Sequence, residues 1–347
     1  MIVFNRNVIL FAIVGYLFLQ LALLYYFIFY SEMDPNYIGD AYTYYNYGKY
    51  EHWDFSGRKN IGIYYLNQFY YFLFGEVSFY LSRVINIFLS IYLFRLILLK
   101  DTQEVSHKYT LIYVAYIFSP AMIYHANINS KEIIVAVLCI LFFVLFSEKK
   151  YFLSFWAFLG VYLFKIYMPV LIVVAIILAK VNYRDRIQLT AVIIMAAIFI
   201  WFADIIFADK FTFLIAHIKD MYGYGGSSLE SLFPLKRNFY EWMFQAPFRI
   251  VVFSLSPVFL DSYSKILVFI FNLVIFVYPT FLLFKYRPYI LQEKRMRLLL
   301  FFFLVLLIFF GSIATNEGLL WRQKLLLSTV AVYILSRLEP YLKYQTK

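Results

Sequence analysis

Residues 8–30 read VILFAIVGYLFLQLALLYYFIFY, an apolar run of 23 residues without a charged side chain. A helix of about 20 apolar residues spans the hydrocarbon core of a bilayer, because each residue advances the helix by about 1.5 Å. The run is too long for the core of a signal peptide, and no small-residue cleavage site follows it. It therefore predicts a retained first transmembrane helix.

The composition of the whole chain agrees with this first segment. Of the 347 residues, 64% are hydrophobic and only 15% are charged, whereas an ordinary soluble domain contains about 25% charged residues. A soluble fold of this length could not bury so much apolar surface, which excludes a soluble enzyme, a disordered chain and a disulfide scaffold. The single cysteine, Cys139, lies within an apolar run and offers neither a disulfide framework nor a cysteine-based metal site.

Apolar runs bounded by charged residues predict an all-α, polytopic transmembrane bundle, a single integral membrane domain over 1–347. The ten expected spans are 8–30, 78–99, 109–124, 132–148, 151–165, 166–180, 187–207, 265–285, 298–312 and 324–337. Lys165 and Pro169 predict a turn between two of them, because neither residue suits the middle of a long apolar helix. The short aromatic stretch 61–74 is expected to form a re-entrant or interfacial helix.

The distribution of Lys and Arg predicts the orientation. With the N-terminus inside, the inner segments hold about 16 Lys/Arg in roughly 50 residues, against about 13 in more than roughly 100 outer residues. The positive-inside rule then places both termini in the cytoplasm. Two large outer loops follow, 31–60 and 208–264. The net charge of +11 is explained by cytoplasmic loops beside anionic lipid, so no nucleic-acid partner is expected.

Basic side chains near the membrane edge are the main candidates for a binding site. An ionisable group at membrane depth costs roughly several kcal/mol unless it is paired or hydrated, so each is a functional hypothesis. We expect these groups to share one anion-binding cavity in the outer half of the bundle: Arg83, His125, Lys131, Lys165, Arg249, Arg322 and Lys324. The alternative for any single Lys or Arg is a side chain that extends to lipid phosphates. For His125 the alternative to a role in anion binding is an ordinary structural hydrogen bond.

Carboxylates are sparser, and three of them are candidate catalytic residues: Asp34, Asp40 and Glu317. A carboxylate beside a basic cavity can accept a proton from a sugar hydroxyl. For Asp40 the alternative is a helix N-cap. Glu132 is expected either to pair with Lys131 or to stabilise the N-terminus of its own helix. No Walker loop, dinucleotide fingerprint or His/Cys ligand cluster is present, so the energy for any reaction is expected to come with the substrate or from a gradient.

Three short patches resemble bacterial cell-surface polysaccharide polymerases, the O-antigen and capsule polymerases, and the broader GT-C class of lipid-dependent glycosyltransferases. The patches are the acidic segment that runs into AYTYY (41–45), NINSKE (127–132) and NEGLLWRQK (316–324). The chain departs from protein-glycosylating GT-C enzymes because it lacks a paired-acid motif after the first helix and a large soluble C-terminal domain.

The resemblance implies polyprenyl-diphosphate-linked sugar chemistry at the outer face of the cytoplasmic (inner) membrane. An essential acid of the first outer loop corresponds to Asp34 or Asp40, and the outer-facing arginines correspond to Arg249 and Arg322. The expected activity is that of a polysaccharide polymerase. Its partners would be the polyprenyl-diphosphate-linked oligosaccharide, the bilayer and other membrane proteins of polysaccharide assembly.

We expect direct displacement at the sugar, with the diphosphate held by arginine and lysine, because the planar guanidinium binds phosphate oxygens in pairs. Fixed cations stabilise the charge that builds on the leaving group. No cofactor is expected, and the scheme requires no metal, since these cations already supply the positive charge; a metal bound by Asp34 and Asp40 is the alternative. The alternatives are a GT-C transferase that uses a polyprenyl-phosphate sugar, a flippase for the lipid-linked oligosaccharide, a membrane acyltransferase centred on His125, and a non-enzymatic subunit.

Overall fold

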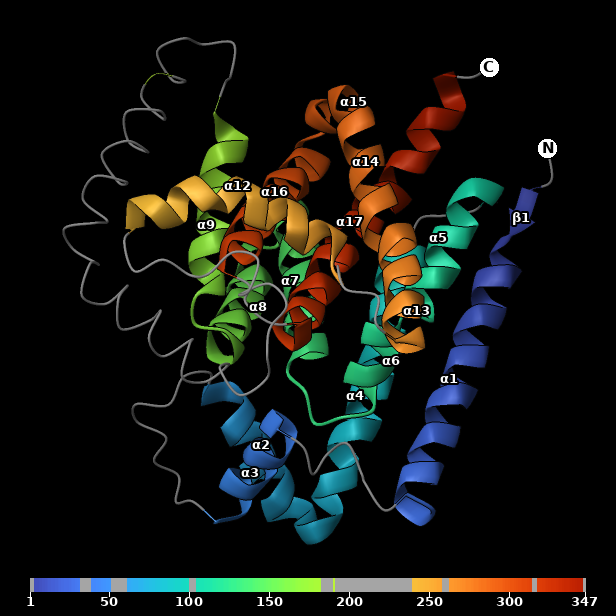
Figure 1. The fold of residues 1–347 in the computed structure, drawn as a ribbon, viewed down its shortest axis with the longest axis vertical. Helices are drawn as coiled ribbons and strands as arrows, with labels where there is room; N and C mark the ends of the chain where they lie inside the picture. Colours follow the sequence, from blue (N-terminus) through green and yellow to red (C-terminus); the bar gives the residue numbers. More distant parts are fainter. Residues whose placement is uncertain are drawn as a thin grey trace.

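The computed structural model is a bundle of helices (Figure 1). It describes residues 3–31, 39–50, 61–99, 104–181, 190, 239–257, 262–313 and 317–345. Over these ranges the only strands are β1 (Val3–Asn5) and β2 (Glu104–Ser106), which pair antiparallel. This ladder joins the segment before the first helix to the segment before the fifth. Apart from it, the expected all-α class is confirmed.

The helices follow in three groups. The first contains α1 (Arg6–Phe29), α2 (Gly39–Tyr50), α3 (Ile61–Phe74), η2 (Gly75–Val77), α4 (Ser78–Phe94) and η3 (Arg95–Leu99). The second contains α5 (His107–Ile117), α6 (Pro120–Ala126), α7 (Glu132–Ser147), α8 (Tyr151–Phe164) and α9 (Met168–Lys180). The third contains α12 (Phe239–Leu255), α13 (Tyr263–Asn272), η4 (Leu273–Val277), α14 (Tyr278–Lys285), α15 (Arg287–Gln292), α16 (Lys294–Ile313) and α17 (Glu317–Gln345).

Several of these helices are long and apolar enough to cross a membrane. In the part of the chain that the structure describes, they are Asn7–Phe29, Ile61–Leu98, Lys265–Lys285 and Lys294–Ser312. Shorter apolar helices accompany them: Glu132–Ser147, Tyr151–Phe164, Met168–Lys180 and Phe244–Leu255. Phe11 and Phe18 of α1 are 75% and 68% exposed, as expected for side chains that face lipid. The fold is that of a membrane protein. The expected span 187–207 lies outside the described ranges, apart from residue 190.

The structure refines three of the expected segments. The stretch 61–74 is helix α3, and it continues through η2 into α4 instead of standing alone. Gly75, at φ +56°, lies at the junction, where a residue without Cβ adopts this backbone at little cost. Figure 1 shows α3 beside α2, and α4 rising from the junction. The predicted turn at Lys165 is confirmed, because α8 ends at Phe164 and α9 begins at Met168.

The second refinement concerns the span expected over 109–124, which is broken into α5 and α6. Pro120 occupies the first turn of α6, where its missing N–H is not needed by the helix. The hydroxyl of Ser119 caps that helix by accepting a hydrogen bond from the backbone N–H of Met122 at 3.3 Å. The break gives α6 its own direction and carries its last residues toward the site described below.

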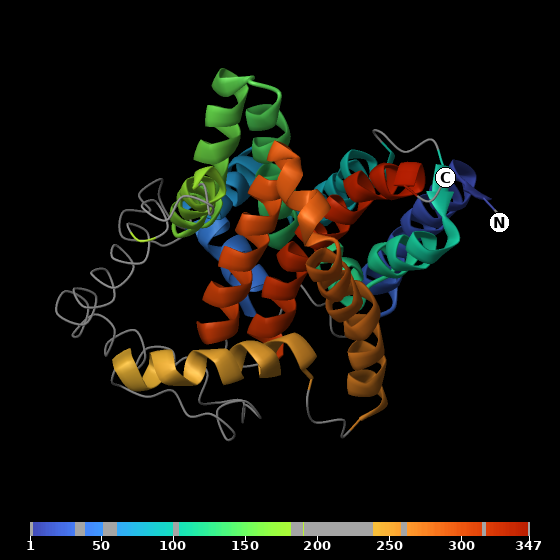
Figure 2. The ribbon, with the colours of Figure 1, turned by 90° about the horizontal axis from the view of Figure 1, so that it is seen from above.

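The third refinement concerns the loop expected over 208–264, of which the described part contains helix α12. This helix lies across α16 (Figures 1 and 2). Gly311 of α16 allows the contact, because a Cβ there would lie 2.8 Å from Ile250 of α12. The rest of the expected loop, up to residue 238, lies outside the described ranges.

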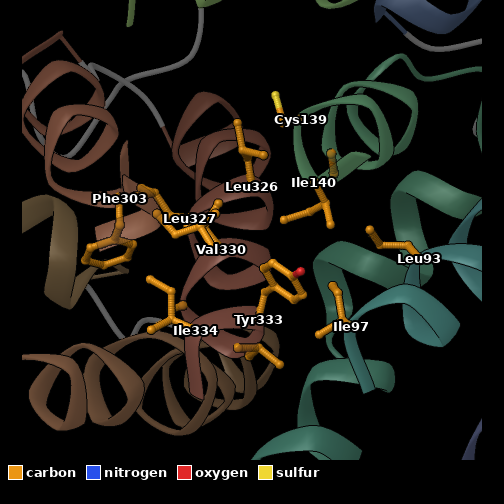
Figure 3. Packing of buried hydrophobic residues seen from close by; sticks show 14 of the residues in the cluster. Leu93, Ile97, Cys139, Ile140, Phe303, Leu326, Leu327, Val330, Tyr333 and Ile334 are labelled. Carbon is orange, nitrogen blue, oxygen red and sulfur yellow. The ribbon is translucent and has the colours of Figure 1, made fainter. Parts of the chain in front are cut away.

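The core is centred on α7 and α17. Nearly every side chain of α17 from Leu325 to Leu338 is buried, which is typical of a helix enclosed on all sides. Figure 3 shows Val330 and Tyr333 of α17 packed between Ile140 of α7 and residues of α4 and α16. Because α17 is enclosed, any polar side chain at its start must find its partners inside the protein.

Candidate functional site

A polar pocket lies near the first turns of α2, α7 and α17. Its lining comes from α2, α6, the loop after α6, and α17: Ala41, Tyr44, Tyr124, His125, Ile128, Asn129, Ser130, Lys131, Glu132 and Arg322. Three of the predicted binding residues, His125, Lys131 and Arg322, therefore meet in one place although almost 200 residues separate the first from the last. We call this cavity the polar pocket.

The loop over residues 127–131 forms one wall of the polar pocket, and asparagine side chains fix its backbone. Asn86 of α4 donates from Nδ2 to the carbonyl oxygen of Ile128 at 2.8 Å and to that of Ser130 at 3.0 Å. Buried backbone carbonyls need such partners, because an unpaired one costs free energy comparable to a lost hydrogen bond. Asn86 thus fixes the backbone of the loop at Ile128 and Ser130, two residues that line the pocket.

Two more side chains anchor the same loop from other helices. Asn67 of α3 exchanges hydrogen bonds with Asn129, one of them at 2.6 Å, and Gln20 of α1 accepts a hydrogen bond from Asn127. Sequence reasoning missed Gln20, Asn67 and Asn86. The available signal was a buried amide within an otherwise apolar helix, because such a group is costly in a membrane unless another helix offers it a partner.

Glu132 forms a buried ion pair at the edge of the pocket. Its carboxylate lies 2.5 Å from Nζ of Lys165, and the side chains are only 7% and 5% exposed. The expected pairing with Lys131 is thus replaced by an ion pair with the residue between α8 and α9. The other expectation holds, because Glu132 is the first residue of α7, where a negative charge is favourable. This arrangement ties the α8–α9 turn to the pocket.

Lys131 connects the loop to α2. Its Nζ donates to the hydroxyl of Tyr44 at 2.9 Å and lies 5.2 Å from the centroid of the Tyr44 ring. Together with Arg322 and Lys165, Lys131 gives the neighbourhood three cations, against one carboxylate, that of Glu132, among its described side chains. Among these described side chains, positive charge is therefore in excess.

His125 is a neutral member of this group. Its side chain is 1% exposed, and Nδ1 lies 3.1 Å from the hydroxyl oxygen of Ser130. Burial lowers the pKa of His125 to about 4, and the nearby Arg322 and Lys165 act in the same direction. At neutral pH the ring is uncharged, so it can donate or accept a hydrogen bond but adds no positive charge.

The predicted acids lie partly outside the described residues. Asp34 is outside them entirely. Asp40 belongs to the first turn of α2, next to Ala41, which lines the polar pocket. Glu317 is the first residue of α17, little more than one turn before Arg322. The side chains of Asp40 and Glu317 lie outside the described set, so the structure places only their backbones, both close to the pocket in sequence.

Two of the predicted cations have other surroundings. Arg249 of α12 is 1% exposed and donates from Nε to the carbonyl oxygen of Ser312 at 2.9 Å. Ser312 is near the end of α16, where carbonyls lack donors within the helix. Lys324, only two residues after Arg322, lines a different and more apolar pocket. The single shared cavity expected from the sequence therefore separates into distinct sites.

Arg83 of α4 is also absent from the lining of the polar pocket. It is completely buried, and its guanidinium carbon lies 5.8–6.0 Å from the centroids of three aromatic rings, those of Phe27, Phe79 and Tyr80. Cations over ring faces gain electrostatic stabilisation, more so when desolvated. Arg83 thus joins α1 to α4.

The chain matches no protein-family model, no curated protein and no solved structure to which it was compared. The fold is a helical bundle with helices apolar and long enough to cross a membrane, and it contains a pocket lined by Lys131, Arg322 and Glu132.

Proposed function

We propose that the protein is a membrane glycosyltransferase, a polysaccharide polymerase that joins oligosaccharide repeat units carried on polyprenyl diphosphate. In this proposal the chain crosses the cytoplasmic membrane about ten times, both termini are cytoplasmic, and the polar pocket opens toward the outer face. The observation that carries it is the meeting of His125, Lys131 and Arg322 in one pocket within a bundle of apolar helices. Burying cations in such a fold is costly, so a ligand of opposite charge is the simplest reason for it.

The charge of the polar pocket suits a diphosphate. A diphosphate diester carries two negative charges, and the neighbourhood holds three cations against the carboxylate of Glu132. Arg322 can bind two phosphate oxygens with its planar guanidinium, whereas Lys131 acts as a point charge. In a site from which water is excluded, such fixed charges act more strongly than in solution.

The proposed reaction is a single displacement. The oxygen of an acceptor hydroxyl forms a bond to the anomeric carbon, while the bond from that carbon to the diphosphate oxygen breaks. The diphosphate leaves with the electron pair, and the cations of the pocket stabilise the charge it gains. Asp40, in the first turn of α2, accepts the hydroxyl proton. The position of Ala41 in the pocket lining supports a role for this turn.

The test is a reconstituted assay with purified protein and lipid-linked repeat units, read as the length of the glycan. We expect Arg322→Ala and Asp40→Asn each to reduce lengthening at least about a hundredfold, as the loss of one transition-state contact typically does. Lys180→Ala, which changes an exposed residue at the end of α9, is the matched control. Undiminished lengthening in both site variants excludes the proposed site.

The same preparation separates the alternatives. A flippase would move a labelled lipid-linked oligosaccharide between leaflets without lengthening it. A GT-C transferase would transfer a single sugar from a polyprenyl-phosphate donor. We expect lengthening without net translocation, and either of the other two outcomes assigns the polar pocket to the corresponding activity.

A further inference from the structure

A second pocket lies between α5, α6, α13 and α17. We call it the Lys324 pocket. Its lining is mainly apolar, with Tyr116, Ala121, Val268, Phe271, Ile275 and Leu325 among the contributors. Cavities that bind small ligands are usually of this kind, with apolar walls and a few polar groups that orient the ligand.

The ammonium group of Lys324 is buried among neutral groups. Its Nζ donates to the carbonyl oxygen of Ser256 at 2.8 Å, to the hydroxyl oxygen of Ser256 at 3.0 Å and to the carbonyl oxygen of Ser254 at 3.4 Å. It also lies 5.4 Å and 5.5 Å from the ring centroids of Phe253 and Phe276. Among the described side chains, no carboxylate lies within ion-pair distance of it. The side chain is 8% exposed, so the protein buries a positive charge here without a described negative partner.

A second polar group stands one helical turn further along α17. Ser328 is 2% exposed, and its hydroxyl has no hydrogen-bond partner among the described residues. Residues four apart lie on the same face of a helix, so Lys324 and Ser328 both line the pocket. Buried polar atoms in folded proteins are nearly always paired, which makes an unpaired hydroxyl beside a buried cation a sign of a ligand.

One wall of the Lys324 pocket is a helix with exposed apolar side chains. α13 belongs to the candidate span Lys265–Lys285, and Leu267 and Ile270 on it are 53% and 51% exposed. Val268 and Phe271 of the same helix line the pocket. Figure 2 shows the α13 segment extending from the body of the bundle. A molecule that already resides in the membrane could therefore lay its apolar chain along α13 and place its head group inside.

The charge of the pocket restricts the head group. One ammonium balances one negative charge, whereas a phosphate monoester carries about −1.5 to −2 at pH 7 and would leave an excess in an apolar cavity. We infer that the Lys324 pocket binds an anionic lipid whose head group bears a single negative charge, held by Lys324 and Ser328. This site is separate from the polar pocket and does not depend on glycosyl transfer.

The test is lipid binding by the full-length protein in a neutral detergent, after exchange removes its native lipid. Native mass spectrometry measures retention of dioleoyl-phosphatidylglycerol, a phosphodiester, of oleate, a carboxylate, and of zwitterionic dioleoyl-phosphatidylcholine. We expect the wild type to retain at least one of the two anionic lipids about tenfold more tightly than phosphatidylcholine. The anionic lipid with the higher affinity identifies the head group.

Variants locate the binding. Lys324→Met should lose this preference, and Ser328→Ala should weaken it about threefold to tenfold. Lys180→Met, which removes an equal charge from an exposed position, should keep it. Equal retention of anionic lipid by Lys324→Met and Lys180→Met overturns the inference, as does a wild type that does not distinguish anionic from zwitterionic lipid. Because glycan lengthening is not the readout, failure here is distinct from failure of the proposed activity.

Discussion

The polar pocket and the Lys324 pocket are built on the same two helices and differ in how they handle charge. α6 and α17 contribute to both, through His125 and Arg322 in one and through Ala121 and Lys324 in the other. In the polar pocket the carboxylate of Glu132 balances one cation. In the Lys324 pocket the described partners of the ammonium are all neutral. The comparison shows that neighbouring cations in the sequence can serve different sites.

Helical geometry explains the separation. Successive side chains of an α-helix are rotated by about 100° around the helix axis, so side chains two residues apart lie on nearly opposite faces of the helix. The side chains of Arg322 and Lys324 therefore lie on nearly opposite faces of α17, whereas those of Lys324 and Ser328 lie on the same face. Four predictions, from the largest expected effect to the smallest, test this contrast between a compensated and an uncompensated pocket.

Glu132→Gln should have the largest effect on stability. The variant leaves the buried ammonium of Lys165 without its carboxylate, which typically costs about 3–5 kcal/mol. Thermal unfolding in detergent measures the loss. The control is Glu148→Gln, at a partly exposed pair with Lys150, where the expected cost is about 0–1 kcal/mol. Equal losses in the two variants would show that the polar pocket does not depend on the buried pair.

Acid should destabilise the protein through His125. The unfolded chain binds a proton at this residue near pH 6.5, but the folded protein does so only near pH 4. The unfolded state therefore takes up more protons as the pH falls, and stability is lost between about pH 6.5 and pH 4. The linkage predicts a loss of about 3 kcal/mol at the lower limit. The measurement is the difference between wild type and His125→Gln in unfolding temperature across that range. An unchanged difference contradicts the prediction.

Asn86→Ala should destabilise the wall of the polar pocket by about 2–3 kcal/mol. The substitution leaves the carbonyl oxygens of Ile128 and Ser130 without the Asn86 side-chain donor, and buried acceptors that lose a partner carry this penalty. Thermal unfolding gives the cost, and the proposed glycan assay should show a parallel loss. A stable variant with normal activity would mean that the loop does not need Asn86 to keep its shape.

Lys324→Met should change the stability of lipid-depleted protein by at most about 1–2 kcal/mol. Replacing a buried charge that lacks a described counter-charge by an apolar side chain of similar length removes a desolvation penalty, and this gain offsets the cost of leaving the carbonyl and hydroxyl oxygens of Ser256 without their donor. The measurement is the same unfolding experiment, next to Glu132→Gln. A loss as large as that of Glu132→Gln would mean that Lys324, too, has its charge compensated within the protein.

Much of the fold is predictable from particular residues. The apolar runs locate α1, α7 and α16 to within a few residues, because only a helix satisfies its own backbone in a membrane. Lys165 with Pro169 correctly predicts the α8–α9 turn. The break at Pro120 was missed, although a proline preceded by a capping serine is a recognised start of a helix.

The candidate site was predictable only in part. Sequence singled out His125, Lys131 and Arg322, which share a pocket, but it grouped Lys324 and Arg249 with them. Charge at the membrane edge identifies costly residues and does not say which of them face one another. The buried amides of Gln20, Asn67 and Asn86 were not predicted for a similar reason, since the role of each depends on a hydrogen-bond partner elsewhere in the chain.

The sequence by itself determined that this is a helical membrane protein, because composition and the lengths of apolar runs are properties of single segments in contact with lipid. Only the tertiary structure decided that Glu132 pairs with Lys165, that Asn86 holds the loop beside His125, and that Arg322 and Lys324 serve separate pockets. These outcomes depend on the rotation and packing of helices that are far apart along the chain, which no local pattern of residues encodes.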